Sequence, residues 1–119
     1  MNTLPPTRFV EIYPFHCVTN QALRHQNKVF RGTGGVSHEN HSCGFVPAFQ
    51  DTQTGTVYLS RFADGRPAPM HLLEGLPQTV VVARNEGGKV EAIKPSMVSG
   101  FMRCGQFYTR EQAAALTVN

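Results

Sequence analysis

The sequence predicts one α+β domain, built mainly from short antiparallel β-strands that form a sheet or a small open barrel, with a short C-terminal α-helix. Three observations indicate this class. The length of 119 residues falls in the single-domain range and suffices to bury a core. Short apolar stretches alternate with turn-forming Gly, Pro, Asn and Asp. A helix-capping pattern stands near the end of the chain. We therefore expect residues 1–119 to form a single domain.

The beginning of the chain predicts an extended tail followed by a strand. Residues 1–8 contain Pro5-Pro6, which blocks helix and favours extended backbone. Residues 9–13 are rich in β-branched and aromatic side chains and stop at Pro14. This beginning has neither the basic nor the apolar segment of a secretory signal.

A short helix and a loop are expected next. Thr19 is a candidate N-cap for a helix over residues 20–27. One side of that helix would carry Ala22, Leu23 and Gln26. Residues 31–42 combine three glycines with a polar stretch, which predicts a flexible loop.

The clearest local signal is a hairpin in the middle of the chain. Residues 43–49 and 57–62 have strand composition, and the turn at 51–55 ends in Gly55, which suits a positive φ. Pro47 cannot donate a ladder hydrogen bond, so we expect its strand at a sheet edge or with a bulge.

Two more hairpins follow in the last third of the chain. Residues 79–84 form a continuous apolar run, the pattern of a strand buried on both faces, and return after a Gly-Gly turn as residues 89–94. Met97–Arg103 and residues 106–108 flank Cys104-Gly105, which predicts a tight turn.

The terminal helix has a definite start signal. Thr109 and Gln112 make a Thr-x-x-Gln capping box, and Glu111 lies in the first turn, where the helix dipole favours an acid. Alanines and a leucine with high helix propensity follow. We expect this helix to pack on the sheet through Ala113 or Ala114 together with Leu116.

Composition narrows the class of protein. The low charged fraction of 16% and the eight Phe argue against a disordered chain, and no apolar run is long enough to cross a membrane. Three Cys, an odd number, disfavour a closed disulfide framework. We expect a cytoplasmic protein with free thiols at Cys17, Cys43 and Cys104, without a cofactor and without a membrane partner.

Three segments, residues 44–49, 58–69 and 100–111, are similar to stretches of small bacterial proteins catalogued as hypothetical. The resemblance covers residues 43–115, about the last two-thirds of the chain. It implies no activity, substrate or site residue.

The sharpest chemical cluster is His38-x-x-His41-x-Cys43, because imidazole and thiolate are ligands that Zn²⁺ prefers. His16 and Cys17 would complete a fourfold site from a distance. However, the paired spacing of structural zinc sites is missing, so we expect a solvated polar loop and no bound metal. A Cys–His nucleophile is the enzymatic interpretation of these residues, but catalytic partners normally meet from distant positions in the sequence. We therefore assign no catalytic residue.

A second cluster lies in residues 61–69 and continues to His71. Arg61 and Arg66 flank a turn fixed by glycine and proline, and guanidinium groups bind carboxylate or phosphate in a planar, bidentate way. The sequence predicts a partner-binding edge formed by Arg61, Asp64, Arg66 and His71. The alternative is that Asp64 pairs with one of the arginines across the turn and serves only the structure.

These clusters support three hypotheses on function. The first is a non-enzymatic interaction or regulatory domain that binds an acidic protein or a phosphate-bearing ligand. The second is a single-stranded nucleic-acid binder, suggested by aromatic–basic neighbours such as Phe30-Arg31 and Arg61-Phe62, although the net charge of +3 is small and dispersed. The third is a small metal-dependent or thiol enzyme.

Overall fold

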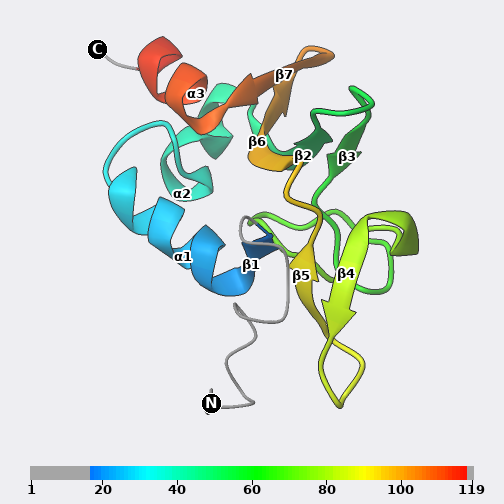
Figure 1. The fold of residues 1–119 in the computed structure, drawn as a ribbon. Coiled ribbons are helices and arrows are strands. Elements are labelled where there is room, and N and C mark those ends of the chain that lie inside the picture. The colour runs from blue at the N-terminus through cyan, green and yellow to red at the C-terminus, as the bar shows by residue number, and fades with distance from the viewer. Residues whose placement is uncertain (1–16, 118–119) are drawn as a thin grey trace.

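The computed structural model describes residues 17–117, which form two antiparallel sheets and three α-helices. Figure 1 shows the helices gathered on one side of the molecule and the sheets on the other. The helices are α1 (Asn20–Val29), α2 (Ser37–Asn40) and α3 (Arg110–Leu116), and short 3₁₀ turns are η2 (His41–Cys43) and η3 (Gln78–Val80). The predicted tail and the predicted strand at 9–13 lie outside the described residues.

The strands divide into a three-stranded and a four-stranded sheet. The first has the order β1-β5-β4, with strands β1 (Val18–Thr19), β5 (Val90–Ile93) and β4 (Val81–Arg84). The second has the order β3-β2-β6-β7, with strands β3 (Val57–Leu59), β2 (Val46–Asp51), β6 (Met97–Arg103) and β7 (Gln106–Thr109). All the strand pairs are antiparallel. The predicted α+β class, with short antiparallel strands and a terminal helix, is confirmed.

The first predicted helix is confirmed and is two residues longer than expected. The Thr19 side chain accepts a hydrogen bond from the Ala22 N–H at 3.1 Å and so caps α1. Leu23 is buried, and Gln26 on the same side is half-buried. This fixes which face of α1 turns inward.

The prediction of a flexible loop over residues 31–42 is wrong, because these residues contain helix α2. Gly34 and Gly35 are packed closely: a Cβ on Gly34 would overlap the Thr117 side chain, and one on Gly35 would overlap the Phe30 ring. The Gly34 carbonyl also accepts a hydrogen bond from the Asn40 side chain at 2.6 Å. Glycine allows the backbone to approach closely here, whereas the sequence suggested only freedom of rotation.

The central hairpin is confirmed as β2 and β3, with Gly55 at a φ of +79°. The expected edge position of Pro47 is wrong, because β2 pairs with β6 as well as β3. The Pro47 carbonyl accepts from the Ser60 N–H at 2.9 Å, and the return bond, which proline cannot donate, is replaced by the Ala68 N–H on the Ser60 carbonyl at 3.0 Å. An incoming loop thus supplies the donor that Pro47 lacks.

The prediction for residues 79–84 is also wrong. They are not a strand buried on both faces: η3 takes up the first part, and β4 forms the edge of its sheet with alternating half-buried and exposed side chains. Val80 is buried, but Val82 is 38% exposed. The apolar run of residues 79–84 therefore belongs to η3 and to an edge strand, β4, which pairs with β5.

The last two elements are confirmed. Cys104 and Gly105 both have positive φ, at 53° and 79°, as a two-residue turn between β6 and β7 requires. The capping box of Thr109 and Gln112 is complete and starts α3. Ala113 is fully buried.

The expected packing of Leu116 is wrong, because this side chain is 53% exposed. Arg110 and Ala113 are buried and Thr117 is half-buried, at the i, i+3, i+7 spacing of one helix face. Leu116 lies to one side of that face.

The core lies between the sheets and the helices in two clusters. The larger contains Leu23, Phe49, Leu73, Leu76, Val80, Val90, Ile93 and Met97. The smaller contains Phe45, Phe101 and Ala113. Among the described residues, no helix has the length and apolar character needed to cross a membrane.

Candidate functional site

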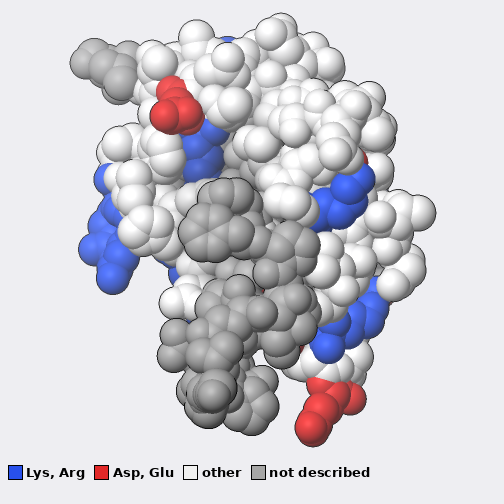
Figure 2. Space-filling model, in the orientation of Figure 1, with Lys and Arg blue, Asp and Glu red and all other residues white. Residues whose placement is uncertain are grey.

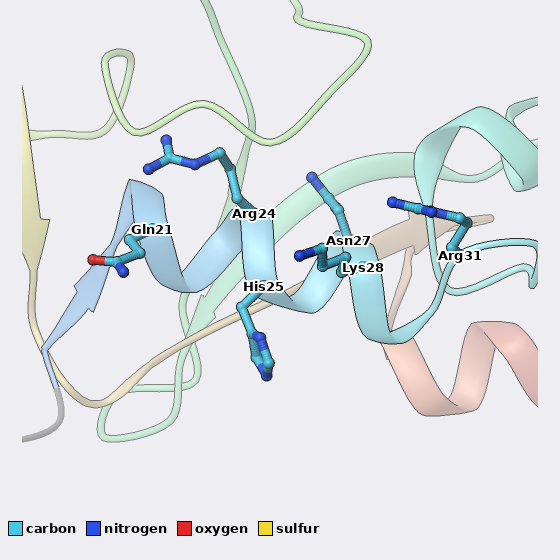
Figure 3. Close-up of a pocket in the computed structure, with 6 residues that line it drawn as sticks. All are labelled: Gln21, Arg24, His25, Asn27, Lys28 and Arg31. Atoms are coloured by element: carbon cyan, nitrogen blue, oxygen red, sulfur yellow. The ribbon is translucent and has the colours of Figure 1, made fainter.

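The outer face of α1 and the residue after its C-cap carry a row of three cations. Arg24, Lys28 and Arg31 follow the i, i+4, i+7 spacing, so they lie along one side of the helix. All three side chains are exposed. Figure 3 shows Arg24 and Arg31 extending to one side of α1, while His25 points to the other.

A groove of about 600 Å³ lies beside these cations, open to solvent. Its described lining residues all come from α1 and Arg31, and we call it the α1 groove. They are Gln21, Arg24, His25, Asn27, Lys28 and Arg31. Every one of these side chains offers a hydrogen-bond donor, so the lining suits an acceptor-rich, negatively charged ligand.

The charge around α1 is unbalanced in the sequence itself. Residues 12–38 contain three of the eleven basic residues and none of the eight acidic ones, so their formal charge equals the +3 of the whole chain. Figure 2 shows basic side chains along the left edge, where α1 lies in Figure 1, and acidic side chains at the top and bottom of the view. Basic side chains also lie on the right of that view, so residues 12–38 are distinguished by having no acidic residue in the segment and not by holding most of the basic ones.

Most of the other described cations are already engaged within the molecule. Arg66 pairs with Asp64 at 2.7 Å, Lys94 pairs with Asp51 at 3.0 Å, and Arg103 lies over the Phe45 ring at 4.2 Å. Side-chain hydrogen bonds also hold Arg61, Arg84 and Arg110. By contrast, Arg24, Lys28 and Arg31 make no side-chain hydrogen bond or ion pair within the described residues. These three exposed cations therefore form a row along α1 and directly after its C-cap.

The arginines predicted at the turn of residues 61–69 have internal partners. Besides its ion pair with Asp64, Arg66 lies 5.1 Å from the centre of the Phe62 ring. Arg61 donates to the Gly65 carbonyl at 2.9 Å, and Arg61 and Pro67 form an isolated β-bridge. The structure brings Arg61, Asp64 and Arg66 together at one exposed turn. Asp64 pairs with Arg66 there, which is the pairing expected if the turn serves only the structure.

His71, the fourth residue of that prediction, lies apart from the turn, in the interior. Its Nε2 is 2.7 Å from the Gly100 carbonyl, and its Nδ1 is 3.1 Å from the Arg110 guanidinium. Because a guanidinium only donates and a carbonyl only accepts, Nδ1 must be the acceptor and Nε2 must carry the proton. Both ring nitrogens of His71 are therefore occupied within the fold.

Arg110 is the centre of this buried network, which the sequence did not reveal. Its Nε donates to the Gln26 side chain and the Ser99 hydroxyl, each at 3.1 Å, and its NH1 donates to the Gly35 carbonyl at 2.9 Å. The network joins α1, the loop before α2, β6 and α3. It is satisfied by neutral acceptors, and no acidic side chain among the described residues pairs with Arg110.

Burial decides the protonation states in the network. Burial and, to a smaller extent, the neighbouring Arg110 charge together lower the pKa of His71 to about 3. Burial also lowers the pKa of Arg110 to about 10, which leaves the guanidinium charged at neutral pH. A neutral imidazole and a charged guanidinium are the states that the hydrogen bonds require.

The candidate metal ligands His38, His41 and Cys43 are not gathered around one point. His38 is in α2, His41 and Cys43 are in η2, and all three side chains are exposed. In the part of the chain that the structure describes, no three His, Cys, Asp or Glu side chains are placed to hold a metal ion. His16, the more distant candidate, lies outside the described residues.

The three cysteines are free thiols, as the sequence predicted. Cys17 is half-buried, and this burial raises the pKa of its thiol. A raised pKa lowers the thiolate fraction at neutral pH and with it the nucleophilic character of Cys17.

The chain matches no protein-family model, no curated protein and no solved structure at a significant level. The assignment of a site therefore depends on the geometry of the molecule.

Proposed function

We propose that this protein is a non-enzymatic binding domain that holds an anionic partner in the α1 groove. One observation carries the proposal: Arg24, Lys28 and Arg31 are exposed and make no side-chain hydrogen bond or ion pair among residues 17–117, whereas most other described cations are engaged. Natural surfaces intersperse both signs of charge, and a single-sign row on a rigid helix attracts and steers an oppositely charged partner.

The helix gives these cations the properties of a binding surface. α1 is capped at its start by Thr19, and Gln26 ties its inner face to Ser99 and Arg110. The side chains on its outer face are thus presented by an ordered backbone, which reduces the entropy lost on binding. Arginine fits carboxylate and phosphate in a bidentate way, while lysine acts as a point charge.

The residues that most resemble catalytic groups support a non-enzymatic role. His71 has both ring nitrogens occupied, and the low pKa of its imidazole keeps it from accepting a proton near neutral pH. The thiol of Cys17 has a raised pKa. Neither group is prepared as a general base or as a nucleophile.

Retention on immobilised heparin, a polyanion, tests the proposal. The variant Arg24→Glu, Lys28→Glu, Arg31→Glu should elute at clearly lower salt than the wild type. The matched control Arg61→Glu, Arg66→Glu, Lys89→Glu changes the net charge equally on other parts of the surface and should elute close to the wild type. Circular dichroism establishes that both variants are folded.

Equal loss of retention in the two triple variants would refute the α1 groove as the site, because it would show that only net charge matters. Greater loss in the control would instead favour the turn around Arg61 and Arg66 that the sequence predicted. The control thus also tests the earlier prediction.

A further inference from the structure

We propose that the anionic partner is an acidic protein segment that carries apolar side chains, and that its apolar part binds a second groove next to the first. This inference rests on the proposed function and adds the class of partner. The second groove, called the apolar groove, has a volume of about 520 Å³. It is lined by Ser37, His38, His41, Phe45, Val46, Pro47, Ala68, Pro69 and Met70.

The apolar groove contains two exposed large aliphatic side chains. Val46 is 47% and Met70 is 46% exposed, and the two are among the few large hydrophobic side chains left accessible in the described residues. Single exposed hydrophobic residues are ordinary, but two of them share one concave site here with two prolines. Methionine adapts its shape to different apolar partners, which suits a binding surface.

A third, smaller hollow connects the apolar groove to the α1 groove. Its volume is about 290 Å³, and it is lined by residues from both neighbours. Asn27 and Arg31 belong to it and to the α1 groove, while Ser37, His38 and Met70 belong to it and to the apolar groove. The three hollows therefore form one path, with the α1 cations at one end, apolar side chains at the other and one acidic side chain, Glu39, in the connecting hollow.

This path fits an extended peptide better than it fits a nucleic acid. Single-stranded nucleic acids need exposed aromatic faces for base stacking beside their phosphate contacts. The one Phe, Tyr or Trp in the lining of the apolar groove is Phe45, which is buried and packed against Arg103, Phe101 and Tyr108. The remaining apolar lining is aliphatic, and a peptide with acidic side chains at one end and aliphatic ones at the other complements the two ends of the path.

Two segments with candidate functional residues in the sequence meet at the apolar groove. His38 and His41 come from the His-rich segment, while Ala68 and Pro69 come from the end of the predicted loop over residues 61–69. The Ala68 N–H bonded to Ser60 and the Ser60 hydroxyl bonded to the Met70 carbonyl hold this wall in place. The sequence motifs thus build the walls of a groove, a role different from metal binding or anion binding.

Selection of random 12-residue peptides displayed on phage, followed by fluorescence polarisation of labelled peptides, tests this inference. The enriched peptides should combine several Asp or Glu with at least one Leu, Ile, Val, Met or Phe. Replacing the apolar residues of a selected peptide by Ser should weaken its binding at least tenfold.

Two protein variants separate the halves of the path. Val46→Thr with Met70→Gln should weaken the selected peptide at least tenfold while leaving retention on heparin unchanged. The matched control, Val82→Thr with Leu116→Gln, changes two hydrophobic residues that are exposed elsewhere and should bind as the wild type does.

Three results would overturn the inference: no enrichment of peptides, enrichment of acidic peptides whose binding ignores the Val46 and Met70 changes, or tighter binding of a 20-nucleotide oligothymidylate than of the selected peptide. Any of these, together with a heparin shift specific to the α1 variant, would leave the proposed function standing. Loss of that heparin shift would remove the proposed function itself.

Discussion

Because of His71, this protein should lose stability in mild acid, at pH values well above those at which carboxylates titrate. The folded state lowers the pKa of this imidazole from 6.5 to about 3, first by burial and then by the Arg110 charge. The unfolded chain therefore binds a proton below pH 6.5 that the folded chain excludes. Stability is fully present above pH 6.5 and falls as the pH decreases toward about 3, by about 1.4 kcal/mol per pH unit. At pH 5 the loss is about 2 kcal/mol, a large part of the roughly 5–15 kcal/mol of a typical domain.

Urea unfolding of the wild type and of His71→Asn at pH 7.5 and pH 5 measures this effect. The substituted amide cannot titrate, and its oxygen lies near the place of Nδ1 and can accept from Arg110. The variant should be less stable at pH 7.5 but should lose about 2 kcal/mol less than the wild type between the two pH values. Asp51 does not interfere: the Gln53 N–H and Lys94 lower the pKa of its carboxyl from 3.8, so its contribution is lost only in stronger acid.

The result that would refute this reasoning is an equal loss of stability in both proteins. If His71→Asn fails to fold, the wild type alone decides the matter by NMR. The imidazole of His71 should keep the Nε2–H tautomer from pH 8 to pH 5, and a titration near pH 6 would contradict the structure.

Three further predictions concern single positions. Thr109→Ala should cost about 1 kcal/mol in urea unfolding, because the first turn of α3 loses its cap, and an unchanged midpoint would contradict the capping geometry. Gly100→Ala should cost at least about 2 kcal/mol, because its Cβ would overlap the Tyr108 carbonyl, whereas Gly87→Ala, which meets only Asn85 at 3.4 Å, should stay within about 0.5 kcal/mol. A reducing agent should leave the melting temperature unchanged, because all three cysteines are free; a lower value on reduction would reveal a disulfide.

The sequence predicted those elements whose signals are local. Thr19 and Thr109 act within three residues of themselves, through hydrogen bonds to Ala22 and Gln112. The turn at Cys104-Gly105 depends on the φ angles of two residues. Such signals do not depend on the rest of the fold, and these predictions are confirmed.

The errors concern positions decided by distant residues. Pro47 lies in the middle of a sheet because Ala68, 21 residues later, supplies a donor to the Ser60 carbonyl. The sequence carried no signal for the burial of Arg110, which depends on Gly35, where the backbone comes close enough to accept its hydrogen bond. A pattern of residue types along the chain contains no information on either partner.

The basic row on α1 is a different case, because its signal was present in the sequence. The spacing of Arg24, Lys28 and Arg31 indicates one helix face only if the helix extends to Arg31 or close to it. The expected helix ended at residue 27, which left Lys28 beyond its end and placed Arg31 in the loop over residues 31–42. The structure ends α1 at Val29, with its C-cap at Phe30, and this extension by two residues places Lys28 on the helix and Arg31 directly after its C-cap.

The buried network and the exposed row belong together physically. Gln26 lies two positions from Arg24 and two from Lys28, so it leaves α1 on the opposite side, where it accepts from Arg110 and Ser99. A ten-residue helix with no acid in its first turn is marginal by itself, and it needs tertiary contacts to be ordered. Those contacts are Leu23 in the core and Gln26 in the network. Folding therefore already orders the α1 groove, so a partner that binds its cations does not have to order the helix.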